Sequence, residues 1–507
     1  MLFNSFEFLL VFLPLALLGF AWLSRISETW AKTWLVLCSL FFYGWWSPVY
    51  LWLLGLSVVA NYVLGAFLFR APPGPAKSRW LAAGVGLNLL ALGYFKYANF
   101  FVETVNATAG THLFLAQIAL PLAISFFTFT EIVFLIEVSK SSDHYYSFLD
   151  YVFFVTFFPH LIAGPIVRHW EVMPQLEEKR LGLRAADLTV GLFIFVLGLG
   201  KKVLLADAVA EYARPFFDVA AAGGTFTSAD AWLGALAYTL QLYFDFSGYS
   251  DMAIGLARMF GIKFPANFSS PYQARSIADF WNRWHITLTR FFREYVYFRL
   301  GGNRCGLFRQ IFNVIATMFL SGLWHGANWT FIVWGAFHGV LLAINHLWRR
   351  LGLELRHPLG RRCQGIAGYL LTMLCVIVGW VYFRASSVEV ANRILASMFS
   401  FPSLTLPETF PFSRILAQLP LLQLSPSQLS THTITELFVL AVVVLIAAFG
   451  PNTQQILARY EPILERVTPD GTQPMTINTV TAAVVGVILG LSLFSINKAS
   501  EFLYYQF

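Results

Sequence analysis

Charged residues are scarce in this chain. Asp, Glu, Lys and Arg together make up 12% of its 507 residues, whereas a soluble globular domain has about a quarter. Hydrophobic residues make up 57%, and apolar runs fill most of the length, so the length does not predict a number of soluble domains. The composition excludes an ordinary soluble enzyme. It predicts an all-α polytopic membrane protein, with one transmembrane domain over residues 1–507 in a lipid bilayer.

Cysteine patterns and metal-ligand motifs are lacking as well. The four cysteines have no CxxC spacing and fit small apolar fillers better than a disulfide framework. No HExxH motif occurs and no carboxylate stands at ligand spacing, so we expect neither a metal site nor a bound cofactor. The net charge of +7 indicates no nucleic-acid partner, because the basic residues gather between apolar runs as topology signals do.

The apolar segments are long enough to cross or enter a bilayer, which takes about 20 residues for a full span. Basic residues mark the inside loops, and Arg25 after the first segment places the N-terminus outside. The region 385–433, with Arg414 as the only Lys or Arg of 400–432, is predicted as an outside loop. The predicted segments are 6–23, 34–46, 49–69, 80–97, 113–138, 147–166, 186–212, 230–258, 311–324, 327–348, 366–383, 434–450 and 477–495.

Two segments differ from simple spans. Segment 147–166 begins and ends on the same predicted side and contains Pro159, Gly164 and Pro165, which favours a broken, re-entrant segment. Residues 276–300 carry aromatic residues at steps of three and four, which predicts one amphipathic helix at the inner interface.

His325 is the first candidate for chemistry. It lies in Ser321–Trp329, a glycine-containing interruption of an apolar stretch, where a titratable residue is costly to bury. A neutral imidazole can act as a general base on an acceptor hydroxyl; a structural histidine bonded to a backbone carbonyl is the equal alternative. Asn328 can orient the imidazole or donate to an oxyanion, or can simply cap a helix.

Other polar residues also interrupt apolar segments. Asp245 and Asp251 flank Ser247 in the segment Gln241–Asp251, and buried carboxylates need partners. We expect those partners among Arg275, Arg283 and His285, and we favour a structural or substrate-positioning role over a proton relay. His160 fits a structural role in a re-entrant loop. Lys201 and Lys202 fit snorkelling at an interface better than contact with an anionic acyl donor.

The motifs together resemble those of the membrane-bound O-acyltransferase superfamily, and within it the bacterial branch of alginate O-acetyltransferases and the teichoic acid D-alanyl transferase. Each motif is weak alone, but they follow the family order over nearly the whole chain. The matching segments are Phe42–Trp46, Gly93–Phe100, Leu120–Phe129, Phe158–Pro165, Asp245–Asp251, Asn267–Phe268, Phe280–Leu288, Gly301–Arg304, Gly322–Gly326 and Trp380–Ala385.

The resemblance implies a ring of about 11–13 tilted transmembrane or re-entrant helices around a central tunnel, with a catalytic core at about 115–350. It implies that His325 is the essential histidine and that His285 is the second polar residue of the site. We expect Asn328, Asp245, Ser247, Asp251, Trp284, Arg283 and His160 to support the site or position substrate.

The resemblance further implies an activity. A cytoplasmic thioester, expected to be acetyl-CoA, would donate acetyl toward an extracytoplasmic polysaccharide, as in alginate biosynthesis, directly or through a periplasmic partner acyltransferase. The enzyme would lie in the bacterial inner membrane. Two alternatives remain open at this point: a conduit for acetyl groups whose partner does the chemistry, and O-acylation of peptidoglycan, lipid or protein.

Overall fold

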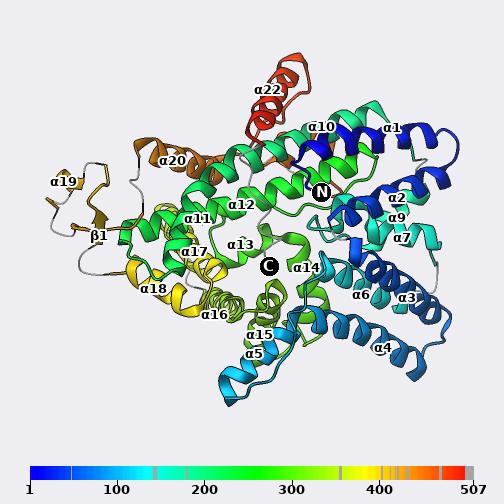
Figure 1. Ribbon diagram of the computed structural model, residues 1–507, viewed down its shortest axis with the longest axis horizontal. Coiled ribbons are helices and arrows are strands. Elements are labelled where there is room, and N and C mark those ends of the chain that lie inside the picture. Colours follow the sequence, from blue (N-terminus) through cyan, green and yellow to red (C-terminus); the bar gives the residue numbers. More distant parts are fainter. Residues whose placement is uncertain are drawn as a thin grey trace. The chain divides into compact units, whose positions relative to one another are not determined.

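A computed structural model describes most of the chain, and helices dominate it (Figure 1). The strands in the described part of the chain are β1 (Leu404–Pro407) and β2 (Leu422–Ser425), which pair in parallel with Leu404 opposite Leu422. The predicted all-α class is therefore confirmed. The described residues are 1–46, 48–140, 145–178, 181–352, 357–400, 404–411, 413–416, 418–419, 422–429, 433–467 and 471–496.

Among these residues, six helical stretches are long and apolar enough to cross a bilayer, judged by length and composition. Each coincides with one of the predicted spans, which confirms a polytopic membrane protein. Shorter apolar helices cover Glu7–Leu23, Ile434–Phe449 and Thr479–Ser495. The six stretches are Pro48–Arg70, Pro75–Ala109, Ala185–Ala221, Leu307–His325, Trp329–Leu351 and Pro358–Arg384.

The chain divides into two compact units, described here separately. The first comprises 1–199, 248–266 and 453–496. Its helices are η1 (Glu7–Phe12), α1 (Leu13–Leu23), α2 (Glu28–Trp46), η2 (Pro48–Tyr50), α3 (Leu51–Arg70), α4 (Pro75–Leu92), η3 (Gly93–Tyr97), α5 (Ala98–Ala109), α6 (Ile124–Lys140), α7 (Phe148–Thr156), α8 (Phe158–Leu161), α9 (His169–Glu178), α10 (Ala185–Gly200), α21 (Thr453–Ile456), η7 (Ala458–Tyr460) and α22 (Thr479–Ser495).

The second unit comprises, in the described residues, 200–247 and 267–452. The long helix α12 (Ser228–Met259) begins in it and ends in the first unit. The other helices of the second unit are η4 (Lys201–Ala206), α11 (Asp207–Ala221), η5 (Pro271–Gln273), α13 (Ile277–Arg283), α14 (Ile286–Phe292), η6 (Arg293–Tyr297), α15 (Leu307–His325), α16 (Trp329–Leu351), α17 (Pro358–Arg384), α18 (Val388–Met398), α19 (Ser413–Leu416) and α20 (Ile434–Phe449).

A buried polar cluster joins three helices of the first unit. Glu131 of α6 accepts hydrogen bonds from Ser57 Oγ at 2.6 Å and from Asn61 Nδ2 at 2.9 Å, both on α3. Asn88 Nδ2 of α4 donates to Asn61 Oδ1 at 2.6 Å. Because polar groups in an apolar interior are costly without partners, this cluster fixes how α3, α4 and α6 pack, and the three lie side by side in Figure 1.

The predicted span 113–138 is wrong over residues 113–123. Residues 111–123 are not helical, and α6 begins only at Ile124. Asn99 of α5 binds the backbone of this segment, since its Oδ1 accepts from Ile118 N at 3.0 Å and its Nδ2 donates to Ala116 O at 3.1 Å. Ala123 then takes a left-handed φ of 63° directly before the helix. A local apolar pattern does not reveal such a long-range restraint.

The break predicted in 147–166 is confirmed. Helix α7 ends at Thr156, Phe157 leaves the helical region with ψ 112°, and the short α8 follows with Pro159 in its first turn.

The predicted outside loop 385–433 contains helix α18 and both strands. Its residues 401–403, 412, 417, 420–421 and 430–432 lie outside the described part.

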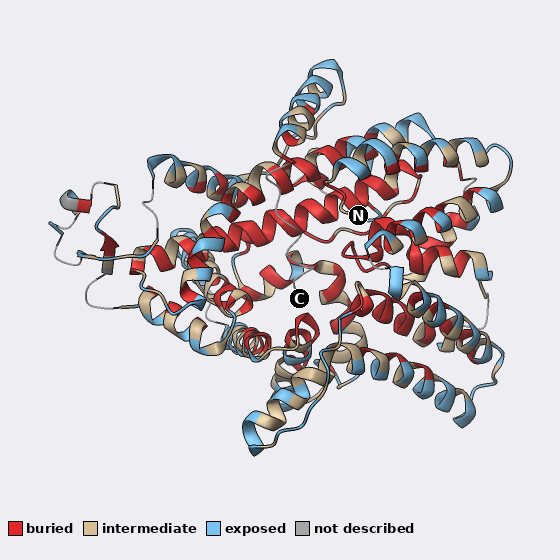
Figure 2. Cartoon of the chain, viewed as in Figure 1, coloured by how far each residue is buried: buried red, intermediate tan, exposed pale blue. Residues whose placement is uncertain are grey.

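Figure 2 shows a marked contrast in burial between α12, which is almost entirely buried, and α22, which is largely exposed. In α22 only Val485 and Ser492 are buried. A Cβ added at Gly486 or Gly490 would meet nothing within 4 Å. Since α22 is apolar, its exposed side chains suit contact with lipid.

Candidate active site

Glycines bring α15 and α16 into close contact and thereby set the position of His325, the last residue of α15. A Cβ at Gly335 would lie 3.0 Å from Gly322 Cα, and one at Gly339 would lie 2.9 Å from Ile315 Cα. Small residues four apart allow helix backbones to approach closely in membrane proteins. Packing at this distance leaves α15 little freedom to slide along α16.

The His325 ring lies in a group of aromatic rings from three helices. Its centroid is 4.9 Å from that of Trp324, 5.1 Å from that of Trp334 and 5.2 Å from that of Phe383, all in edge-on contacts. Its exposed fraction is 4%. We call Trp324, Trp334 and Phe383 the aromatic cage. They hold the imidazole in one orientation within apolar surroundings.

His285 does not lie within one continuous helix, so the prediction of a single amphipathic helix over 276–300 is wrong. Helix α13 ends at Arg283, Trp284 is extended, and His285 has a left-handed φ of 42° before α14 begins. Two backbone hydrogen bonds hold the break: Ser269 N donates to Arg283 O at 3.0 Å, and Ile286 N donates to Asn267 O at 2.9 Å.

This break turns the His285 side chain into the protein interior, where none of it is exposed. The ring packs edge-on against Phe246 at 4.7 Å and lies 6.1 Å from the Trp324 ring. Burial lowers the pKa of His285 to about 3, so the imidazole stays neutral at physiological pH. A neutral ring offers one donor and one acceptor nitrogen.

The structure brings the two predicted catalytic histidines together. The centroids of the His285 and His325 rings are 6.4 Å apart. A direct hydrogen bond of about 2.9 Å would place two imidazole centroids roughly 5.2 Å apart. The observed separation is longer, so the two rings are neighbours that do not bond directly to each other.

Trp284 and Arg283 support the break rather than face His325. The Trp284 ring stacks on Phe280 at 5.6 Å and on Tyr272 at 6.0 Å, and it lies 4.8 Å from Trp380. Arg283 is a third exposed; its Nε donates to Asp279 Oδ1 at 2.7 Å and its Nη1 to Ser269 O at 3.3 Å. Both side chains fix the backbone that carries His285.

Asn328 caps α16, which is the alternative that the sequence left open. Its Oδ1 accepts from Thr330 N at 3.0 Å, and its Nδ2 donates to Ser386 O at 3.3 Å. The cap ends the turn after His325 and starts the next helix. A direct part in the chemistry stays a prediction.

The expected partners of Asp245 are wrong. Asp245 Oδ1 lies 2.7 Å from Lys202 Nζ, which also contacts Asp207 Oδ1 at 2.8 Å. All three side chains are at most 7% exposed, so snorkelling is wrong for Lys202. The pairing joins α12 to the π-helical segment η4, and buried charges require such partners. Ser247, two residues on, is buried as well.

Asp251 and His160 belong to the first unit, and the site described here includes neither. Asp251 accepts from Thr453 Oγ1 at 2.6 Å and from Gln454 Nε2 at 2.7 Å, again not from the expected arginines. His160 Nε2 lies 2.9 Å from Phe154 O, across the break between α7 and α8. Both contacts stabilise the first unit.

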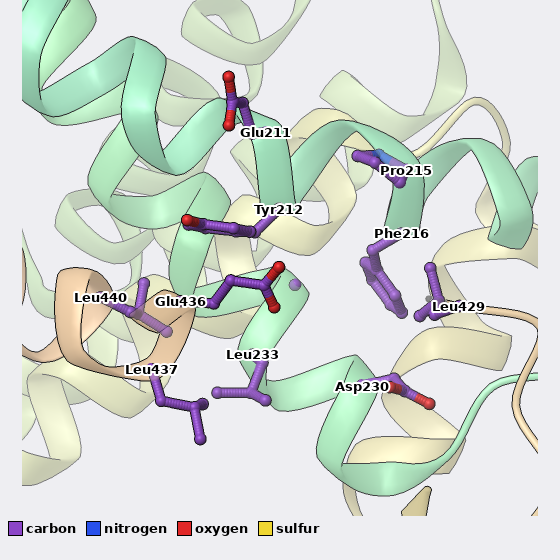
Figure 3. Close-up of a pocket in the computed structure, with 11 residues that line it drawn as sticks. Glu211, Tyr212, Pro215, Phe216, Asp230, Leu233, Leu429, Glu436, Leu437 and Leu440 are labelled. Carbon is purple, nitrogen blue, oxygen red and sulfur yellow. The ribbon is translucent and has the colours of Figure 1, made fainter. Parts of the chain in front are cut away.

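A pocket of about 160 Å³ in the second unit has the carboxylates Glu211, Asp230 and Glu436 among mostly apolar lining residues (Figure 3), and its lining includes no histidine. Asp230 accepts from Thr227 N at 2.8 Å as a helix cap. Glu436 forms a capping box with Thr433, whose N donates to Glu436 Oε2 at 2.9 Å. Asp230 and Glu436 thus stabilise helix ends.

Some contributors to the site were not found from the sequence. They are Trp334 and Phe383 of the aromatic cage, and Lys202 as the partner of Asp245. Their roles depend on which helices pack together. Trp380-Val381-Tyr382-Phe383 was noted only as a motif. Among the described residues, no three His, Cys, Asp or Glu side chains are grouped as metal ligands would be; the prediction of no metal stays a prediction.

The helical membrane fold agrees with comparisons to known proteins. The model of the membrane-bound O-acyltransferase family matches residues 20–379. The chain therefore belongs to this family, and it is a membrane-embedded acyltransferase.

Named relatives come from several bacteria. The chain is 41% identical to the peptidoglycan O-acetyltransferase of Helicobacter pylori, with 78% of this chain and 80% of that protein covered. It is 40% identical to the probable alginate O-acetylase AlgI of Pseudomonas putida over the full length of both. It is 32% identical to the teichoic acid D-alanyltransferase of Streptococcus thermophilus over 45% of this chain and 57% of that protein.

Proposed function

We propose that this enzyme is an O-acetyltransferase of the bacterial inner membrane. It takes acetyl from a cytoplasmic thioester, acetyl-CoA, and passes it toward an extracytoplasmic polysaccharide, directly or through a periplasmic partner acyltransferase. The similarity to a probable alginate O-acetylase over the full length of both chains supports this choice. The similarity to a peptidoglycan O-acetyltransferase supports acetyl as the group and leaves peptidoglycan as the second acceptor.

The observation that carries the chemistry is the pair of buried imidazoles, whose ring centroids lie 6.4 Å apart. His325 accepts the proton of the acceptor hydroxyl while the hydroxyl oxygen attacks the thioester carbonyl carbon. His285, neutral and held by the helix break, donates a hydrogen bond to the developing oxyanion. When the carbon–sulfur bond breaks, the His325 imidazolium returns the proton to the thiolate, so the cycle needs no external proton.

The aromatic cage supports a small acyl group. Trp324, Trp334 and Phe383 surround the His325 ring within 5.2 Å. Excluding water around a thioester limits its hydrolysis and strengthens polar interactions with the oxyanion. An acetyl group needs less space beside such rings than a fatty acyl chain does.

The test uses inverted membrane vesicles supplied with acetyl-CoA labelled in the acetyl group. Wild type is compared with His325→Ala, and with His346→Ala as a matched loss of a half-buried histidine from the neighbouring α16. We expect label on carbohydrate or on a partner protein with wild type and with His346→Ala only. Equal labelling with His325→Ala at matched protein level would refute the catalytic role and favour the conduit.

A further inference from the structure

Two inside-predicted segments that are far apart in the sequence line one pocket of the first unit. The end of α1 contributes Ala21, Ser24 and Arg25, and the residues before α10 contribute 181–184, including Arg184. The pocket has a volume of about 370 Å³. Both arginines are exposed. By the distribution of basic residues, both segments face the cytoplasm.

The two guanidinium groups differ from Lys32 and Arg258 of the same unit, which are paired with carboxylates. Lys32 lies 2.6 Å from Asp150 Oδ1, and Arg258 lies 3.0 Å from Asp187 Oδ1. Within the described part of the chain, neither Arg25 nor Arg184 contacts a carboxylate. The pocket residues include no Asp or Glu, so the mouth carries two uncompensated positive charges.

Apolar side chains line the pocket and the neighbouring face of α1. Leu181 and Leu183 form part of its wall. On α1, Leu18 and Trp22 are 67% and 66% exposed, within two turns of Arg25. An exposed tryptophan near the end of an apolar helix is typical of the membrane interface. A ligand here meets two cations at the membrane surface and an apolar helix face that leads into the bilayer.

We propose that this pocket binds the phosphate group of an anionic phospholipid, with Arg25 and Arg184 as its ligands and α1 beside the acyl chains. Basic pockets on the cytoplasmic side of helix bundles bind such headgroups, and each Lys or Arg near an anionic surface contributes about 1 kcal/mol. Two arginines correspond to a roughly 30-fold change in affinity, at about 1.4 kcal/mol per tenfold. This site is independent of the acyl-transfer site.

The experiment titrates the purified full-length protein in detergent with phosphatidylglycerol and measures bound lipid by native mass spectrometry. The variant is Arg25→Gln with Arg184→Gln. The matched control is Lys77→Gln with Arg79→Gln, which removes the same charge from another inside-predicted segment and from residues outside this pocket. Melting temperatures in phosphatidylcholine show that every variant is folded, and Arg25→Lys with Arg184→Lys keeps the charge.

We expect the glutamine variant to bind phosphatidylglycerol about 30-fold more weakly, and the control and the lysine variant to stay within threefold of wild type. Inorganic phosphate and glycerol 3-phosphate are added as competitors. Displacement of lipid by either at submillimolar concentration would assign the pocket to a soluble phosphate instead of a lipid. Unchanged binding in the glutamine variant, or an equal loss in the control, would overturn the proposal.

Discussion

The contact between Gly322 and Gly335 gives the sharpest test of how α15 positions His325. In Gly335→Ala the new Cβ would lie 3.0 Å from Gly322 Cα and even closer to the carbonyl oxygen of Met318. Both neighbours are backbone atoms and cannot rotate away, so the two helices must separate. Adding a methyl group to tightly packed structure costs about 1–3 kcal/mol.

Separation of the helices moves His325 relative to His285, because the two rings belong to different elements of the second unit. A misplacement of about 1 Å can cost about 100-fold in rate. We therefore expect Gly335→Ala to lose about 10- to 100-fold in acetyl transfer while the protein remains folded. The rate is measured with labelled acetyl-CoA at matched protein level, and folding by the melting temperature.

The chain provides a matched control in Gly490→Ala. Gly490 is also inside an apolar helix, but an added Cβ there meets nothing within 4 Å. This variant should keep the wild-type rate and should not lower the melting temperature, since alanine is the better helix former. A wild-type rate in Gly335→Ala, or an equal loss in both variants, would refute the reasoning.

Two further predictions concern buried charge and pH. Lys202→Met leaves Asp207 and Asp245 without their ammonium partner, and removing one member of a buried ion pair costs about 3–5 kcal/mol. We therefore expect a strongly lowered melting temperature, which adding Asp245→Asn should partly restore. An unchanged melting temperature in Lys202→Met would contradict the pairing. For His285, the folded pKa of about 3 lies below the unfolded value of about 6.5, so its contribution to stability is complete above pH 6.5 and is lost as pH falls toward 3. When the pH is lowered from 7.5 to 5.0, the free energy of unfolding of wild type should fall by about 2 kcal/mol more than that of His285→Gln. Unfolding in detergent at both pH values measures this difference. Equal losses would show that His285 takes up its proton in the folded state.

The membrane spans could be predicted from the sequence because an apolar run of sufficient length is a local property. The break in 147–166 was predicted for the same reason, since Pro159 and Gly164 act on their own backbone. The pairing of His285 with His325 was implied by family motifs, and the structure places their ring centroids 6.4 Å apart.

The remaining features depend on contacts between distant segments. The aromatic pattern in 276–300 continues through the break at His285, and the carbonyl of Asn267 and the amide of Ser269, on an earlier segment, help to hold that break. The partner of Asp245 is Lys202, on an earlier helix, and no sequence spacing indicates which of several basic residues packs beside it. Asn99 likewise determines where α6 begins through a contact with residue 118.

The left-handed backbone of His285 also has an evolutionary consequence. At φ 42° a residue with a Cβ pays about 1–2 kcal/mol that glycine does not. Selection for stability alone would therefore favour His285→Gly, which relaxes the backbone but removes the imidazole from the site. Natural proteins lie close to their stability threshold, so a strained histidine is retained only where its side chain contributes more to fitness than the stability it costs. We expect screens for thermostable variants to select replacements at this position and to lose acyl transfer when they do.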